Sequence, residues 1–173
     1  MSAQRGFTLI ELLVVIAIMG IVGVFSMANF RSFGEDQKLK NSLLDIQSML
    51  RTAQTNAATN TKCANQFEAP WRVEFANTTN TTIINLKCIE SPNTSVIKKT
   101  LTFGPDITLE RTISGTGVSC PTELPLRISF APGSGEISLE GDYCSSLIIT
   151  LRNNKRATTK SLKIEQGGRI YEQ

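Results

Sequence analysis

The stretch Arg5-Gly6-Phe7-Thr8-Leu9-Ile10-Glu11 and the apolar run behind it decide how this chain is organised. From Phe7 to Phe30 the only charged residue is Glu11. At helical rise, this run of 24 residues is long enough to cross a hydrocarbon core of about 30 Å. The short segment before it carries one positive charge, Arg5, so we expect the amino end to stay cytoplasmic and the rest to cross.

Glu11 is the unusual residue of this segment, because a carboxylate in an apolar helix costs roughly 2.5–3.5 kcal/mol at its centre and less near its end. Two explanations fit. If the chain is cut between Gly6 and Phe7, the new amine of Phe7 is a cation that Glu11 of a neighbouring copy could neutralise in a polymer. Alternatively, the segment is an ordinary signal anchor and Glu11 lies near the headgroups.

The residues Gly6-Phe7-Thr8-Leu9-Ile10-Glu11-Leu12, followed by an apolar helix, resemble the class III leader of type IV pilins and type II secretion pseudopilins. The likeness comprises the glycine before the cleavage site, the first mature phenylalanine and the glutamate at the fifth mature position. It implies that a prepilin peptidase removes residues 1–6 by cutting after Gly6 and methylates the amine of Phe7. It also implies that Glu11 acts in assembly, paired with the Phe7 amine of another subunit.

Composition narrows the classes of function. The sequence contains no histidine, which removes Ser-His-Asp and Cys-His nucleophile systems and histidine metal sites. Its acids are scattered at turns or exposed strand positions without a partner base, so we expect no enzyme, no cofactor and no metal site. The formal net charge of +3 does not by itself imply a nucleic-acid partner.

One long helix is expected at the amino end. No proline precedes Pro70, so a helix can run from Phe7 to Ala58, with a transmembrane and assembly half over residues 7–30 and an amphipathic half over residues 31–58. The amphipathic half carries an apolar stripe at intervals of three and four residues. The stripe consists of Leu39, Leu43, Ile46, Leu50, Ala53 and Ala57. We expect it to be core packing rather than a binding surface.

Residues 59–173 predict a β-rich globular domain. Short runs with strand-like composition or alternation recur there, separated by turn residues. These runs are Trp71–Phe75, Thr82–Ile89, Ser95–Phe103, Ile107–Ile113, Leu126–Phe130, Glu136–Leu139, Leu147–Leu151, Leu162–Glu165 and Arg169–Tyr171. The predicted fold class is α+β, a long amino-terminal helix packed on antiparallel β-sheet, and the leader makes it pilin-like by resemblance.

Three segments of this part resemble the GspH/FimT/FimU class of minor pilins. They are Leu50-Arg-Thr-Ala-Gln-Thr-Asn-Ala57, Phe130-Ala-Pro-Gly-Ser-Gly135 and Ile164-Glu-Gln-Gly-Gly-Arg-Ile170. The likeness is patchy over residues 59–125, where lengths and cysteines vary. This resemblance implies a helix packed on two small β-sheets.

Four cysteines, at positions 63, 88, 120 and 144, lie beyond the apolar segment, and none forms a CxxC pair. An even number in an exported domain predicts two disulfides, for which three connectivities exist. We favour Cys63–Cys88 and Cys120–Cys144, because each closes a local loop.

Five basic residues follow one another without an acid between them on a predicted hairpin loop, and a sixth lies near the end of the chain. They are Arg152, Lys155, Arg156, Lys160, Lys163 and Arg169. One interpretation is a phosphate-binding patch for DNA. The other, which we favour, is a solvated loop or a contact with an acidic neighbouring subunit. Some members of the resembling class bind DNA through a terminal Gly-Arg-x-Arg, and Gly168-Arg169-Ile170-Tyr171 lacks the second arginine.

Together these features predict a minor pilin, a structural and priming subunit near the tip of a type IV pilus. The alternatives are a DNA-binding minor pilin for natural transformation and a GspH-type pseudopilin of a type II secretion system. The resemblance implies as partners other minor pilins, the major pilin, the prepilin peptidase and an inner-membrane assembly platform, with DNA as a weaker candidate. We expect a single-pass inner-membrane protein of a Gram-negative type envelope, with its globular domain in the periplasm, which then joins the pilus at the cell surface.

Overall fold

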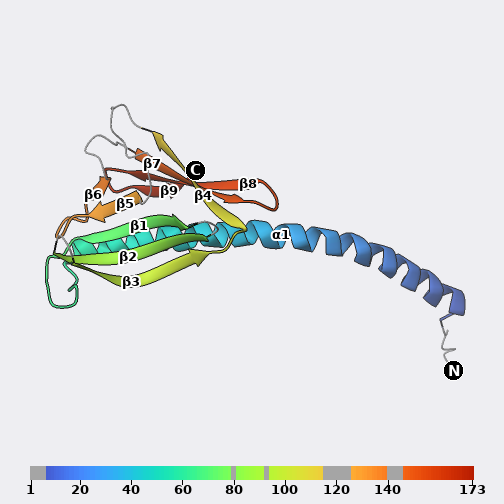
Figure 1. Cartoon of the computed structure of the whole chain (residues 1–173). Helices are drawn as coiled ribbons and strands as arrows, with labels where there is room; N and C mark the ends of the chain where they lie inside the picture. The colour runs from blue at the N-terminus through green and yellow to red at the C-terminus, as the bar shows by residue number, and fades with distance from the viewer. Residues whose placement is uncertain (1–6, 79–80, 92–93, 115–125, 140–145) are drawn as a thin grey trace, which may run out of the picture. The chain divides into compact units, whose positions relative to one another are not determined.

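The computed structural model describes residues 7–78, 81–91, 94–114, 126–139 and 146–173, with the backbone alone for 25–32, 77–78 and 111–114. These ranges hold one helix and nine strands (Figure 1). The elements are α1 (Leu9–Ala58), β1 (Trp71–Thr78), β2 (Thr81–Ser91), β3 (Thr94–Phe103), β4 (Ile107–Ser114), β5 (Leu126–Phe130), β6 (Ile137–Leu139), β7 (Ser146–Asn153), β8 (Thr158–Glu165) and β9 (Ile170–Glu172). Each predicted run forms a strand, with some ends shifted by a few residues.

The carboxyl end of α1 is closed by a Schellman motif. The amide of Thr61 donates to the carbonyl of Asn56 at 2.8 Å. The amide of Asn60 donates to the carbonyl of Ala57 at 3.2 Å. Asn60 has a φ of 50°, the left-handed conformation that this motif requires and that asparagine adopts more readily than most residues. The helix therefore stops at Ala58, as predicted, although no glycine marks the position.

The strands of the described ranges form two antiparallel sheets. One has the order β3-β2-β1-β5-β6 and the other the order β4-β7-β8-β9. Buried residues alternate with partly exposed ones along β2 and β5, so one face of the first sheet packs on the core. Figure 1 shows the carboxyl-terminal part of α1 running along β1, β2 and β3.

The apolar stripe of α1 lies in the centre of the core. Its six predicted residues, Leu39, Leu43, Ile46, Leu50, Ala53 and Ala57, are at most 1% exposed. Met49, which the predicted stripe omitted, is equally buried. Both sheets contribute side chains to the same cluster, and Phe75 and Phe130 are its largest fully buried members. The α+β fold with a helix packed on antiparallel sheet is confirmed, and the stripe is core packing.

A disulfide joins Cys63, in the loop after α1, to Cys88 in β2, with Cα atoms 5.8 Å apart. This is the first of the two favoured pairings. Both cysteines are fully buried, and Trp71 lies directly opposite Cys88 in the ladder of β1 and β2. Cys120 and Cys144 lie outside the described residues, so their pairing stays a prediction.

The chain divides into two compact units, Met1–Gln37 and Lys38–Gln173. The second unit holds the described strands and begins inside the predicted amphipathic half of the helix. Within the described part of the chain, no helix combines the length and the apolar character needed to cross a membrane. The single-pass anchor stays a prediction.

Candidate functional site

The amino end of α1 is closed by reciprocal hydrogen bonds between Thr8 and Glu11. The backbone N–H and the hydroxyl of Thr8 both donate to Oε2 of Glu11, at 3.1 Å and 2.9 Å. In return, the backbone N–H of Glu11 donates to the hydroxyl oxygen of Thr8 at 3.4 Å. This arrangement is a capping box, which satisfies amides that a helix start leaves unpaired. Glu11 therefore has a partner inside its own chain.

The capping box was missed from the sequence, although its signal is present. Thr8 and Glu11 have the Thr-x-x-Glu spacing that precedes an apolar run at a helix start. An intrachain role does not exclude pairing with an amine, because a carboxylate oxygen accepts more than one hydrogen bond. Gly6 and the rest of the leader lie outside the described residues, so cleavage before Phe7 stays an expectation.

An exposed apolar surface follows the capping box. Every residue from 7 to 24 is exposed, and Phe7 and Leu9 are 86% and 82% exposed. A continuous apolar surface of this kind marks a site of contact with lipid or protein. Residues 7–24 are therefore the candidate anchoring and assembly surface of the chain.

The five basic residues expected on one hairpin loop do not share it, which corrects that prediction. The ladder of β7 and β8 continues to the pair Asn153 and Thr158, so the turn comprises only residues 154–157. Lys155 and Arg156 lie in this turn, Arg152 lies in β7, Lys160 and Lys163 lie in β8, and Arg169 precedes β9.

Four of these cations have a carboxylate partner brought close by the second sheet. The pairs are Arg152–Glu110 at 3.4 Å, Lys155–Asp106 at 2.7 Å, Lys160–Glu172 at 2.6 Å and Lys163–Glu165 at 3.0 Å. The hydrogen bond from Lys155 holds the pKa of Asp106 below its usual value, and Lys38 lies 3.3 Å from the same carboxylate. Much of the positive charge in this stretch is therefore balanced within the chain.

The paired cations of β8 also lie on different faces of the sheet. Leu162 and Ile164 are buried and their neighbours are partly exposed. Because side chains alternate along a strand, Lys160 shares the face of these buried residues and Lys163 lies on the opposite face. The strands therefore do not bring the six basic residues together into one patch.

The three segments that resemble the GspH/FimT/FimU class meet at Gln54. The side-chain amide of Gln54 donates to the carbonyl of Gly168 at 3.3 Å. A Cβ at Gly135 would lie 2.9 Å from the backbone oxygen of Gln54, and a Cβ at Gly168 would lie 2.9 Å from its side-chain nitrogen. Both glycines have positive φ, 67° and 88°, which favours glycine at each position. At Gly135 the Cβ would also meet backbone, so this turn can approach the helix closely only with glycine there.

Replacing Gly135 with alanine is expected to lower the free energy of unfolding by about 3 kcal/mol, because the Cβ meets backbone and the φ is strained. Urea unfolding of the processed chain in mild detergent measures this. Gly167→Ala is the matched control: nothing lies within 4 Å of its Cβ. We expect a change below about 0.5 kcal/mol there. Equal unfolding midpoints for the two variants would contradict the close approach at Gln54.

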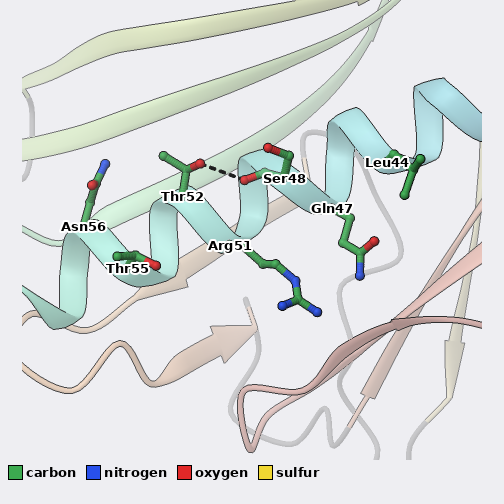
Figure 2. A pocket seen from close by; sticks show the side chains of 7 residues that line it. All are labelled: Leu44, Gln47, Ser48, Arg51, Thr52, Thr55 and Asn56. Atoms are coloured by element: carbon green, nitrogen blue, oxygen red, sulfur yellow. Dashed lines mark hydrogen bonds between the residues drawn. The ribbon is translucent and has the colours of Figure 1, made fainter.

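The helix also holds the last strand of the second sheet. Gln47 and Arg51 donate to the carbonyl of Ile170 at 3.4 Å and 3.3 Å. β9 is an edge strand, so these bonds tie a sheet edge to α1. Figure 2 shows both side chains pointing from α1 into the space beside the carboxyl-terminal strands. A surface groove runs along this side of the helix, lined by Leu44, Gln47, Ser48, Arg51, Thr52, Thr55 and Asn56.

Comparison with known proteins gives matches at the amino end. Residues 1–27 match the family model of the prokaryotic N-terminal methylation motif. Two curated fimbrial proteins of Pseudomonas aeruginosa are each 35% identical to this chain over 57 residues, which are 33% of this chain and 36% of the relative. The chain thus spans about a third of the length of the curated relatives it matches. No solved structure matches the chain.

The methylation motif implies a membrane-anchored amino terminus. It coincides with the capped helix start and the exposed apolar surface over residues 7–24. The motif, the partial likeness to fimbrial proteins and the helix packed on antiparallel sheets together support the identification of this chain as a type IV pilin-like protein.

Proposed function

We propose that this chain is a minor pilin, a structural and priming subunit near the tip of a type IV pilus. The observation that carries this proposal is the amino-terminal segment, where the methylation motif coincides with an apolar helix surface exposed over residues 7–24. Such a surface is suited to lie first in a bilayer and then among the helices of other subunits.

The minor-pilin part of the proposal is supported by the junction at Gln54. The segments that resemble the GspH/FimT/FimU class come from three distant parts of the sequence, and their contacts converge on this one residue. A subunit present once at a tip needs a heterologous surface that stacks on the next subunit, not a self-complementary one.

In this proposal the prepilin peptidase cleaves after Gly6 and methylates Phe7. The apolar helix then anchors the chain by a single pass in the inner membrane, with the globular unit in the periplasm. The assembly platform transfers it into a fibre beside other minor pilins and the major pilin. We propose no catalytic activity, because the sequence lacks histidine and several described carboxylates are engaged in ion pairs.

Mass spectrometry of fibres sheared from the native cells tests the proposal. The expected result is this chain at a low ratio to a major subunit, beginning at N-methylated Phe7. A Gly6→Ala variant is the control and should stay unprocessed and absent from the fibres. Absence of the native chain from fibres, with a processed form in the membrane fraction, would favour the pseudopilin alternative instead.

The DNA-binding alternative has weaker support. Phosphate contacts need cations that are free to replace the counterions of DNA. Four of the six candidate residues already have carboxylate partners, and Lys160 and Lys163 lie on opposite faces of β8. Subunit contact is therefore our preferred role for this stretch.

A further inference from the structure

Next to the groove of Figure 2, a separate hollow lies where α1 meets the turn before β9. It has a volume of about 300 Å³ and is lined by Arg51, Gln54, Gly168, Arg169, Ile170 and Tyr171. Arg51 lines both the hollow and the groove, so the two lie next to each other at this residue. Arg51 and Arg169, which are 118 positions apart in the sequence, therefore line one small space.

Neither arginine has a carboxylate partner within the residues that the structure describes. Arg51 donates to the carbonyl of Ile170, which is neutral. Glu165 is close enough to Arg169 for its pKa to be lowered by that charge, but the hydrogen bonds to Glu165 come from Lys163 and Tyr171. Two positive charges beside one hollow repel each other, and an anion bound between them would offset this repulsion.

The walls of the hollow are held in place before any ligand arrives. Gln47 and Gln54 fix the backbone of Ile170 and Gly168 to the helix. A Cβ at Gly168 would lie 2.9 Å from Nε2 of Gln54, so a larger residue there would have to displace the side chain that holds this wall. A preformed site loses less entropy on binding than one that must be assembled.

We propose that this hollow binds a carboxylate side chain of an acidic segment on a partner polypeptide. A guanidinium matches a carboxylate with paired, charge-assisted hydrogen bonds. The adjoining groove offers Leu44, which is 44% exposed, and the hydroxyl of Ser48 to the residues beside that carboxylate, whereas the hydroxyl of Thr52 already donates to the carbonyl of Ser48.

A polypeptide carboxylate fits the hollow better than a nucleic-acid backbone. A run of phosphates needs a row of cations, whereas the neighbouring Lys160 and Lys163 are each bound to a carboxylate. The ring of Tyr171 lies 5.8 Å from the Lys163 ammonium and its hydroxyl donates to Glu165, so it is not free to stack on a base. The inference goes beyond assembly of the amino-terminal helix, because every residue it uses lies in the second compact unit.

Titration calorimetry of the full processed chain in mild detergent, with hexaglutamate as the probe, tests this site. Arg51→Gln and Arg169→Gln should each weaken binding about tenfold. Arg169→Gln removes none of the hydrogen bonds that hold β9 to the helix, so its result does not depend on the stability of that contact. Arg152→Gln is the matched control, since it removes the same charge from a guanidinium already paired with Glu110.

Binding of hexaglutamate that falls with Arg51→Gln and Arg169→Gln, but changes less than about twofold with Arg152→Gln, supports the site. An equal loss in all three variants would show attraction to net charge only and would overturn it. The site would also be overturned if a hexathymidylate oligonucleotide, or hexaglutamine, bound more tightly than hexaglutamate. The fibre experiment can fail without affecting this result, because the two use different parts of the chain.

Discussion

Glu11→Ala should reduce the amount of this chain in sheared fibres by at least roughly tenfold, while cleavage after Gly6 continues normally. In our proposal the Phe7 amine enters an apolar bundle of helices, where a cation without a partner costs several kcal/mol. Removing the carboxylate leaves that cation unpaired. The measurement is quantitative mass spectrometry of the fibre and membrane fractions from cells that carry each variant.

The capping box gives a second reason for Glu11, and two variants separate it from charge pairing. Glu11→Gln keeps an oxygen that can close the capping box but removes the charge. Thr8→Val removes the hydroxyl of the cap and keeps the carboxylate. If charge pairing governs assembly, the Glu11→Gln variant should be depleted from the fibres as strongly as Glu11→Ala. The Thr8→Val variant should then be incorporated normally. The reverse pattern would mean that Glu11 acts by starting the helix, and would remove the charge-pairing explanation.

Replacing Cys63 and Cys88 together with alanine should lower the free energy of unfolding by about 3 kcal/mol. The disulfide joins residues 25 apart in the sequence, so it restricts a sizeable loop of the unfolded chain. For a chain of this size, the urea midpoint should fall by about 1.5 M. Loss of the link also frees the loop after α1, which otherwise connects to β2 through this bond.

Trp71 provides the signal for that experiment. It is the single tryptophan of the sequence, is 3% exposed and lies opposite Cys88 in the ladder. Alanine variants are preferable to a reductant, because a reductant would also break the predicted Cys120–Cys144 bond. An unchanged midpoint in the double variant would show that the core holds the loop without the disulfide.

The elements of the fold could be predicted because their signals are local. The stripe on α1 and the alternation in runs such as Ile107–Ile113 depend on neighbouring residues only. The capping box at Thr8 and Glu11 is equally local, and was missed because the carboxylate was considered only as a charge. The end of α1 at Ala58 was located from composition, whereas its cause, the left-handed Asn60, needed the backbone.

The candidate sites depended on residues that are distant in the sequence. Lys155 is 49 residues from Asp106, and Arg152 is 42 residues from Glu110. Only the register of β4, β7 and β8 puts these charges side by side. A run of basic residues therefore looked like a free patch in the sequence and is largely balanced in the fold. That Arg51 and Arg169 line one hollow could not be foreseen for the same reason.

The sequence by itself determined the amino-terminal processing motif, the long helix, the strands and which face of the helix is buried. Each of these follows from short-range patterns of apolar residues and from specific residue types at fixed spacing. Only the tertiary structure decided which charges are neutralised, how three separate segments meet at Gln54, and which two arginines share a hollow. These depend on strand order and register, which bring distant residues into contact through packing and hydrogen bonding across the whole core.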